Sequence, residues 1–187
     1  MLNYHSSIKK ERSYSDLTVK EISPHMKLSL RGKSREFLST IGKNINMILP
    51  MEANTSSSSN NYTSMWLSPD EWMLVSNNTV DKENNRYEIE ELLFNKISKA
   101  NIGAVTDVSD QFVMINLAGE KIFDLFSAGC PFNFNEFKNK KGAVVQTLLL
   151  QIDVIIHLKE INTVNLFVRR SFSQHLMSWI DDTASRL

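Results

Sequence analysis

A long alternation of apolar and polar residues lies in the second half of the chain. Between Val144 and Leu158, every even-numbered position except Gln146 is aliphatic, and the odd-numbered positions include several polar residues. A period of two residues is typical of a β-strand with one buried face, so this pattern predicts a long strand or a bent pair of strands. Shorter strands are expected at residues 26–31, 72–76, 104–108, 111–117 and 163–168.

Apolar residues at helical spacing predict two amphipathic helices, each near the end of one half of the chain. The two stripes consist of Ile89, Leu92, Leu93, Ile97 and Ala100, and of Phe172, Leu176, Trp179, Ile180 and Thr183. The last helix is expected to open at Ser171 with a capping box, in which the Ser171 hydroxyl and the Gln174 side chain satisfy free backbone N–H groups. Helices that alternate irregularly with mostly antiparallel strands indicate an α+β fold.

Two stretches of the chain resemble each other. Residues 28–42 (LSLRGKSREFLSTIG) and 115–129 (INLAGEKIFDLFSAG) both run from alternating apolar residues to a glycine, a short helical pattern and a second glycine. This similarity predicts duplicated β-α-β-β-α-type units. We expect a flexible tail at residues 1–16 and a single domain at 17–187, built of two pseudo-repeats at about 17–103 and 104–187.

Two polar stretches are predicted to be exposed, flexible connections. Residues 52–64 (EANTSSSSNNYTS) are low in complexity, and residues 77–86 are similarly polar. Such composition is typical of solvated loops. The first stretch interrupts one unit and does not separate two domains.

Charge and cysteine content exclude several functional classes. Lysine plus arginine and aspartate plus glutamate both total 21, whereas a nucleic-acid-binding surface needs a basic surplus. The single cysteine, Cys130, excludes an internal disulfide and a site with several thiolate ligands. We find no signal peptide and no apolar run of membrane-spanning length, and we expect a cytoplasmic protein without nucleic-acid or membrane partners.

No set of residues indicates catalysis, a bound metal or a bound nucleotide. Cys130 follows a predicted helix, where the helix dipole disfavours a thiolate. The four histidines lack metal-ligand spacing, and His157 is expected on the polar face of its strand. Asp107 and Asp110 flank a predicted bend, where aspartate commonly bonds its own backbone. The chain has six glycines and no phosphate-binding glycine motif.

The stretch Trp66-Leu-Ser-Pro-Asp-Glu-Trp72 has two interpretations. Ser68 to Glu71 suit a type I turn with Pro69 at its second position, so a hairpin is expected. The same residues also fit a helix N-terminus, although the apolar run after Glu71 is short and β-prone. The flanking tryptophans are predicted to pack beneath the turn, or to form a contact surface for a partner.

An ordered series of motifs resembles the gamma subunit of heterotetrameric sarcosine oxidase. The sequence WLSPDEWMLV is similar to the WLGPDEWLL signature of that family, with Ser68 in place of its glycine. Further pieces agree in order over residues 17–184: Leu28-Ser-Leu-Arg-Gly32, Ala104-Val-Thr-Asp-Val-Ser-Asp110, Leu117-Ala-Gly119, Ala128-Gly-Cys-Pro131, Gln146-Thr147 and Arg170-Ser-Phe172.

The resemblance implies a fold, partners and a role. The fold would be that of the aminomethyltransferase-like folate-binding domain, and the partners would be the alpha, beta and delta subunits of an enzyme that demethylates sarcosine to glycine. The methyl carbon would pass to tetrahydrofolate or leave as formaldehyde. FAD, FMN, NAD, tetrahydrofolate and zinc would belong to the assembled complex, with no cofactor bound by this chain alone. The alternative is a stand-alone folate-binding or one-carbon-transfer protein of the same fold.

We expect no catalytic residue and no metal ligand in this chain. The residues that we predict to have structural or subunit-interface roles are Trp66, Pro69, Asp70, Glu71, Trp72, Asp107, Arg170 and Ser171.

Overall fold

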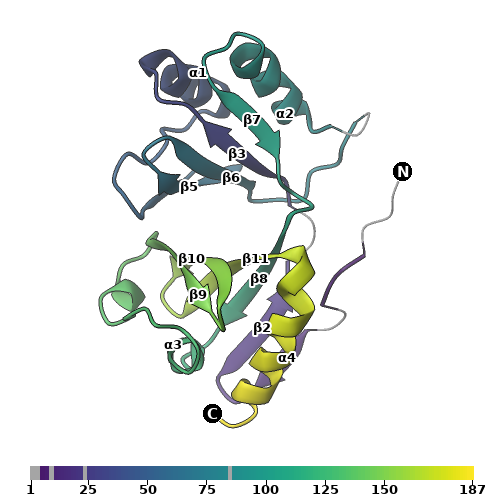
Figure 1. Ribbon diagram of the computed structural model, residues 1–187, viewed down its shortest axis with the longest axis vertical. Helices are drawn as coiled ribbons and strands as arrows, with labels where there is room; N and C mark the ends of the chain where they lie inside the picture. The colour runs from purple at the N-terminus through teal and green to yellow at the C-terminus, as the bar shows by residue number, and fades with distance from the viewer. Residues whose placement is uncertain (1–4, 9–10, 23–24, 84–85) are drawn as a thin grey trace. The chain divides into compact units, whose positions relative to one another are not determined.

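The computed structural model describes residues 5–8, 11–22, 25–83 and 86–187, which form two compact units (Figure 1). The first unit contains the described residues from 25 to 110, and the second contains residues up to 22 and from 111 to 187. Each unit has one antiparallel sheet and its own helices. The α+β class and the antiparallel sheets predicted from the sequence are confirmed.

The first unit has a five-stranded sheet in the order β4-β5-β6-β3-β7. Its strands are β3 (Lys27–Arg31), β4 (Ser56–Ser58), β5 (Tyr62–Ser68), β6 (Glu71–Ser76) and β7 (Ala104–Asp107). Its helices are α1 (Arg35–Ile45) and α2 (Glu88–Leu93), and α2 continues into a π-helical turn, Phe94–Ser98. One face of the sheet and the apolar sides of these helices share a core that includes Leu28, Leu30, Phe37, Trp72 and Leu93.

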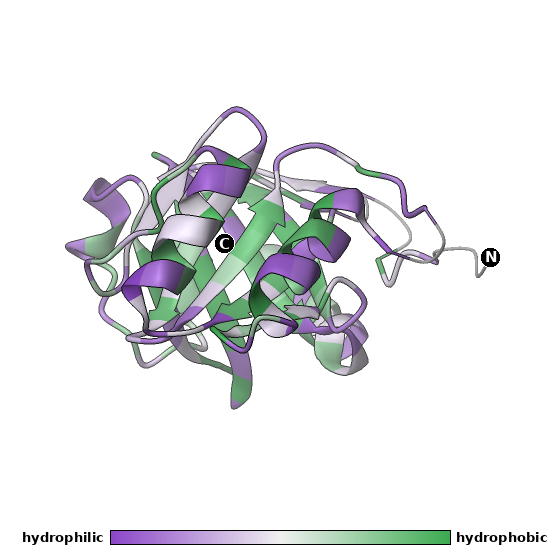
Figure 2. Cartoon of the chain, turned by 90° about the horizontal axis from the view of Figure 1, so that it is seen from above, coloured by the Kyte–Doolittle hydropathy of each residue, from purple (hydrophilic) through white to green (hydrophobic). Residues whose placement is uncertain are grey.

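The second unit has a six-stranded sheet in the order β1-β2-β8-β11-β10-β9. Its strands are β1 (Arg12–Tyr14), β2 (Leu17–Glu21), β8 (Phe112–Ala118), β9 (Val144–Leu149), β10 (Ile152–Glu160) and β11 (Thr163–Arg169). Its helices are α3 (Ile122–Ser127), α4 (Ser173–Ala184) and the 3-10 turns Phe137–Asn139 and Arg170–Phe172. Residues of α3 and α4 join the strands in a second core, and Figure 2 shows mostly hydrophobic strands beside helices that carry both polar and apolar turns.

The two sequence segments 17–103 and 104–187 contain the same order of elements. Each begins with a strand, continues with a second strand and a helix, and then runs through three strands to a last helix. The first strand of each segment belongs to the sheet of the other segment. Strand β2 of the first segment pairs with β8, and strand β7 of the second segment pairs with β3. This order of elements is what a duplication would produce, and the duplication itself stays a prediction.

The described part of the expected N-terminal tail contains ordered structure. Residues 12–14 form β1, which pairs with β2. Ile8 is 8% exposed, and its backbone N–H donates to Glu21 Oε2 at 2.7 Å. Residues 5–8 and 11–16 therefore differ from the flexible tail predicted from composition, because a buried apolar side chain and strand pairing hold them. Residues 1–4 and 9–10 of that tail lie outside the described residues.

The alternation between 144 and 158 belongs to a hairpin whose buried face changes parity. Leu150 and Gln151 both have positive φ and form a two-residue turn between β9 and β10. Pairing across this turn sets Leu149 opposite Ile152 and Val145 opposite Ile156, so odd positions of β9 share a face with even positions of β10. As a result Leu148 is 42% exposed while Leu149 is fully buried. The prediction that the even-numbered residues form the buried face was therefore wrong for β9.

The expected capping box at Ser171 was also wrong. The 3-10 turn Arg170–Phe172 precedes α4, whose N-cap is Phe172 with no side-chain cap. Ser171 is exposed, and the hydroxyl that bonds backbone here is that of Ser173, which donates to the Arg170 carbonyl at 2.7 Å. The helical backbone already includes Ser171, so this residue lacks the extended conformation that an N-cap requires.

The serine-asparagine stretch forms a hairpin and not the flexible connection that its composition predicted. Residues 56–58 pair with Thr63–Met65 as strands β4 and β5. The Ser58 and Thr63 hydroxyls lie 3.1 Å apart, and the Asn77 amide donates to the Ser59 carbonyl at 2.8 Å. Asn77 thus joins the second predicted connection to this hairpin. Hydroxyl and amide side chains satisfy one another across strands, so a low-complexity sequence can still order an edge hairpin.

Two glycines of the first unit accommodate the ring of Phe37. A Cβ at Gly32 would lie 2.6 Å from Phe37 Cγ, and a Cβ at Gly103 would lie 2.5 Å from Phe37 Cδ2. Real Cβ atoms do not approach so closely, so both positions require the absence of a side chain. The fully buried Phe37 ring in turn contacts Trp72, with ring centroids 6.1 Å apart. The glycine of the LSLRG motif therefore serves the packing around Trp72.

Candidate functional site

The stretch Trp66–Trp72 forms the hairpin between β5 and β6. Ser68 pairs with Glu71, so Pro69 and Asp70 are the two loop residues. Neither loop residue has positive φ, which agrees with the predicted type I turn and excludes the helix N-terminus. A type I turn does not match the twist of a two-residue hairpin, and the register shifts between Trp66 and Ser68 to accommodate it.

The carboxylates of this turn bind side chains of the same unit. Glu71 accepts from the Ser29 hydroxyl at 3.0 Å and from Arg31 Nη2 at 3.1 Å. Asp70 accepts from the Ser68 hydroxyl at 2.8 Å and lies 3.7 Å from Lys33 Nζ. The Ser68 hydrogen bond, followed by nearby cations, holds the pKa of Asp70 below its usual value. Both carboxylates therefore fasten the turn to the end of β3.

The two tryptophans are cross-strand partners with different environments. Trp72 is 1% exposed, and its Nε1–H donates to the Pro50 carbonyl at 2.7 Å. Trp66 is only partly buried and packs against the edge of the same core. Because Trp72 is almost fully buried, it cannot contact another protein directly. Of the two tryptophans, Trp66 is the one whose side chain is accessible to a partner.

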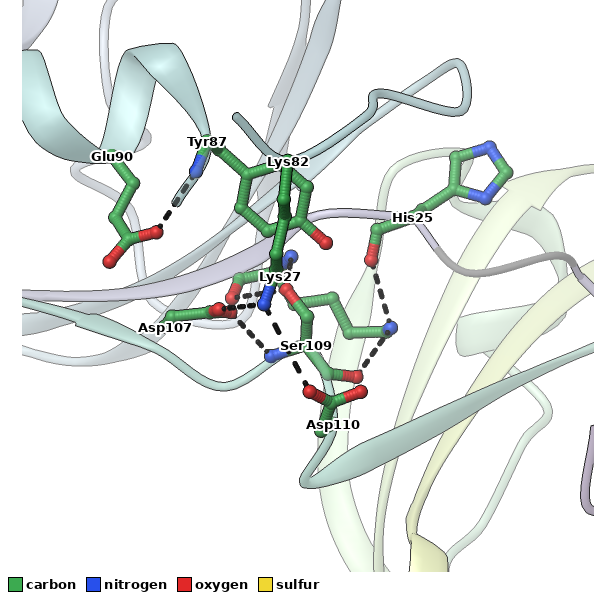
Figure 3. A network of polar contacts seen from close by, with 8 residues as sticks. All are labelled: His25, Lys27, Lys82, Tyr87, Glu90, Asp107, Ser109 and Asp110. Atoms are coloured by element: carbon green, nitrogen blue, oxygen red, sulfur yellow. Dashed lines mark hydrogen bonds and ion pairs between the residues drawn. The ribbon is translucent and has the colours of Figure 1, made fainter. Parts of the chain in front are cut away.

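A separate polar network lies at the end of β7 (Figure 3). Lys82 Nζ lies 2.6 Å from Asp107 Oδ2 and 4.0 Å from Asp110 Oδ2. The backbone N–H of Ser109 donates to Asp107 Oδ1 at 2.9 Å, which is the aspartate turn expected from the sequence. Lys27 is 3% exposed, and its ammonium donates to the His25 and Ser109 carbonyls at 3.1 and 3.2 Å. These contacts attach residues 82 and 109 to the ends of β3 and β7.

The network fixes the charge of Asp107. Burial alone would raise the pKa of this carboxyl group, but hydrogen bonds from Lys82 and Ser109 outweigh burial and hold the pKa below its usual value. Burial would likewise lower the pKa of Lys82, and the Asp107 carboxylate raises it instead. The pair is therefore ionised at neutral pH. An ionised carboxylate that is already saturated by donors is suited to positioning a loop and unsuited to accepting a proton.

Replacing Lys82 with methionine is expected to lower the free energy of unfolding by about 1–2 kcal/mol, because it leaves a half-buried carboxylate without its cation. A double-mutant cycle with Asp107→Asn should give a coupling energy of about 1 kcal/mol in urea denaturation at pH 7. The folded pKa of Asp107 lies below its unfolded value, so this stability is present above about pH 4 and disappears as pH falls through the folded pKa.

The matched control for this cycle is the exposed pair Lys121–Asp124, whose charged atoms lie 3.6 Å apart. Its coupling energy should stay below about 0.5 kcal/mol, because solvent screens exposed ion pairs. Equal coupling energies for the two pairs would contradict the structural importance of Lys82.

The candidates in the second unit do not form a reactive site. Arg170 Nη1 donates to the His5 carbonyl at 3.3 Å and to the Ser7 hydroxyl at 3.4 Å, so this side chain binds the N-terminal segment. Cys130 Sγ lies 3.6 Å from the Thr147 hydroxyl, two residues after the C-cap of α3. His157 is 5% exposed, contrary to the exposed polar face predicted from the strand pattern. Burial, followed by repulsion from Lys159, lowers the pKa of His157 to about 4, so the ring is neutral at pH 7.

One hollow of about 480 Å³ lies on the sheet of the second unit. Its lining residues come from β8, β9, β10 and β11 and are Phe112, Gln146, Thr147, Leu148, Asp153, Val154, Ile155 and Arg169. One cation and one carboxylate share this lining, and none of the predicted site residues belongs to it. Among the described residues, no group of three His, Cys, Asp or Glu side chains is arranged to hold a metal ion.

The predicted site residues therefore fall into three places. Five lie on the Trp66–Trp72 hairpin, Asp107 lies in the network of the same unit, and Arg170 and Ser171 precede α4. Sequence reasoning missed Lys27 and Lys82 as members of that network. Lys82 lies in a polar stretch, and Lys27 occupies a buried position in a strand, so neither has a local pattern that distinguishes it from a solvated lysine.

The family model for the gamma subunit of sarcosine oxidase matches residues 32–186. The chain belongs to this family. The match spans both units and includes the Trp66–Trp72 hairpin and the Arg170 segment. Of the network it includes Lys82, Asp107, Ser109 and Asp110, whereas His25 and Lys27 precede it. The resemblance carried by the ordered motifs is confirmed.

Solved structures agree with this family at the level of the fold. The chain is similar to a chain of the heterotetrameric sarcosine oxidase from Corynebacterium sp. U-96 in complex with pyrrole 2-carboxylate. The TM-score is 0.80 with 19% identity, and the match covers 94% of this chain and 87% of that chain. The aminomethyltransferase T of the glycine cleavage system from Bartonella henselae matches with a TM-score of 0.63 and 13% identity over 91% of this chain and 49% of that chain. A sequence comparison with curated proteins gave no match.

The chain thus shares its fold with about half of the aminomethyltransferase chain that it matches. No described helix is long and apolar enough to cross a membrane.

Proposed function

We propose that this chain is a non-catalytic gamma subunit that supports a heterotetrameric sarcosine oxidase. Its partners would be alpha, beta and delta subunits, and the cytoplasmic assembly would demethylate sarcosine to glycine. The methyl carbon would pass to tetrahydrofolate or leave as formaldehyde. The observation that carries the proposal is the family match over residues 32–186, which is supported by a similar fold in a heterotetrameric sarcosine oxidase.

The polar residues of the chain support a structural role. The hairpin carboxylates Asp70 and Glu71 and the network carboxylate Asp107 bind neighbouring donors of their own unit. Trp72 has its ring in the core and its N–H on a carbonyl, which favours packing over partner contact for this residue. Each of these groups thus makes its contacts within its own unit, which agrees with the role of a supporting subunit.

We assign FAD, FMN, NAD, tetrahydrofolate and zinc to the partner chains. The residues of this chain do not fit a phosphate-bearing cofactor well. In the hollow of the second unit, the Asp153 carboxylate lines the same space as Arg169, the one cation of the lining. The sequence also has no glycine-rich phosphate loop. We therefore derive no catalytic step for this chain.

Expression of the full chain alone and together with its three predicted partners tests the proposal. The isolated chain should show no sarcosine-dependent oxygen consumption, whereas the co-expressed assembly should show it and should contain this chain in stoichiometric amount. Flavin-dependent oxidation by the isolated chain would contradict the non-catalytic role. An assembly that forms and turns over fully without this chain would contradict the supporting role.

The alternative function is a stand-alone folate-binding or one-carbon-transfer protein. The observation that favours it is the similarity in fold to an aminomethyltransferase. Calorimetric titration of the isolated chain with tetrahydrofolate distinguishes the two functions. Submillimolar binding by the lone chain would favour the alternative, and no detectable heat at millimolar ligand would favour the supporting subunit.

A further inference from the structure

The hollow on the sheet of the second unit contains an ordered row of side chains. Its strands lie in the order β8-β11-β10-β9 (Figure 1). Arg169 of β11 pairs with Phe112 of β8, and Asp153 of β10 pairs with Leu148 of β9. The register of β10 against β11, extended by one residue, places Asp153 opposite Arg169. Opposite residues of antiparallel strands project to the same face, so one row crosses the four strands in the order Phe112, Arg169, Asp153 and Leu148.

This row lies on the face of the sheet that is turned away from the core shared with α3 and α4. The residues next to the row along each strand belong to that core, and they are Val113, Val168, Val154 and Leu149. Successive side chains of a strand point to opposite faces, so the row itself does not pack against the helices. All four of its members line the hollow, which has a volume of about 480 Å³.

The two charges at the centre of the row are not paired. Opposite charges at facing positions of neighbouring strands commonly stabilise a sheet by direct contact. Arg169 and Asp153 are both exposed, and neither side chain forms an ion pair with any group in the part of the chain that the structure describes. A guanidinium and a carboxylate therefore stand side by side in the hollow, and both are available to a ligand.

The surroundings of this charged centre are mostly apolar. Phe112 and Leu148 flank it at the two ends of the row, and Leu148 is 42% exposed although it is aliphatic. Ile155 adds a buried apolar side chain to the lining, at 7% exposure. Small-molecule sites have this composition: apolar walls of about 300–1,000 Å³ with a few polar groups that fix the orientation of the ligand.

We propose that this hollow binds an α-amino acid with an apolar side chain. The carboxylate of the ligand pairs with the Arg169 guanidinium, its ammonium group pairs with the Asp153 carboxylate, and its side chain lies against Leu148 and Ile155. Facing residues of adjacent strands have Cβ atoms about 4.5–5.5 Å apart, so a molecule that carries both charges on one carbon atom can reach both groups.

The paired charges also determine which ligands the hollow rejects. An acid without an ammonium group meets the Asp153 carboxylate, and an amine without a carboxylate meets the Arg169 guanidinium. Each such ligand leaves one like charge opposed to it, which disfavours binding. The inference goes beyond the proposed function, because it assigns this chain a ligand of its own and does not depend on the partner subunits.

The test is calorimetric titration of the full chain with L-leucine and with three probes that each lack one of its features. The probe 3-methylbutylamine lacks the carboxylate, 4-methylpentanoate lacks the ammonium group, and glycine lacks the apolar side chain. Leucine should bind at least about tenfold more tightly than each probe, because each probe loses one charged hydrogen bond or one apolar contact.

Two variants connect this selectivity to the charged centre. Arg169→Gln should weaken leucine binding by about tenfold or more without weakening 3-methylbutylamine, which has no carboxylate for the guanidinium. Asp153→Asn should weaken leucine by a similar factor without weakening 4-methylpentanoate. A merely structural effect would instead weaken every ligand. The matched controls are Lys121→Gln and Asp124→Asn, an exposed pair at α3, and both should bind leucine as the wild type does.

Three results would overturn the inference. The first is no leucine binding at millimolar concentration, and the second is equal affinity for leucine and for a probe that lacks a charge. The third is leucine binding that both hollow variants leave unchanged, which would place the ligand elsewhere on the chain. Co-expression with the partners tests the proposed function separately, so either idea can fail while the other stands.

Discussion

Replacing Trp72 with alanine is expected to lower the free energy of unfolding by about 3–5 kcal/mol. The substitution removes a ring that is 1% exposed and in contact with Phe37, and it leaves the buried Pro50 carbonyl without its donor. A domain is stable by only about 5–15 kcal/mol, so the variant should be partly unfolded at 37 °C. Urea denaturation of the full chain, followed by tryptophan fluorescence and circular dichroism, measures the effect.

Trp66→Ala is the matched control for this substitution. It removes the same side chain from the opposite residue of the strand pair, but Trp66 is only partly buried. Its cost should be about 1–2 kcal/mol, since less apolar area is lost. A Trp72→Ala chain that unfolds at the wild-type urea concentration, yet assembles into a complex with no turnover, would contradict the structural role and point to catalysis at this hairpin.

Replacing Gly119 with alanine is expected to destabilise the second unit by about 3 kcal/mol or more. Gly119 has φ +137°, a conformation that L-residues rarely adopt, and a Cβ there would lie 2.0 Å from the Asp16 carbonyl oxygen. That oxygen also accepts from the Lys121 N–H at 3.3 Å, just before α3. Relief of the clash would therefore have to move the turn before β2 away from the start of α3.

The control is Gly42→Ala in α1. Gly42 has no positive φ, and its Cβ would meet only the Met47 carbonyl oxygen, at 3.3 Å. Alanine favours a helix by about 1 kcal/mol over glycine, so this variant should be neutral or slightly stabilised. Denaturation midpoints of the two variants give the comparison, and a Gly119→Ala chain as stable as Gly42→Ala would show that the turn at Asp16 adapts freely.

The sequence predicted those elements whose cause is local. Strands β3, β6, β7, β8 and β11 follow from short alternating or continuous apolar stretches, and the turn at Pro69-Asp70 follows from the fixed φ of proline. The aspartate turn at Asp107 follows from the same kind of short-range chemistry. Each of these features depends on residues only a few positions apart, so a single sequence is sufficient to predict it.

The remaining features depend on partners distant in sequence. The parity change at Leu148 depends on the register of a hairpin, and β4 depends on hydroxyl pairs across two strands. Within the candidate site, the Lys82–Asp107 pair joins residues 25 positions apart, and the Pro50 carbonyl meets Trp72 across 22 positions. Polar stretches give no signal for such pairs, because solvated and paired lysines look alike in a sequence.

The pairing of β2 with β8 has a consequence for biosynthesis. The ribosome completes β2 about 90 residues before it begins β8, the inner neighbour of β2 in the sheet. At a synthesis rate of ~5–20 residues per second, β2 waits roughly 5–20 s for this partner. During that interval its apolar residues Leu17 and Val19 lack the core that will bury them. The second sheet therefore cannot close around β2 until β8 has been synthesised, and until then β2 is open to premature association.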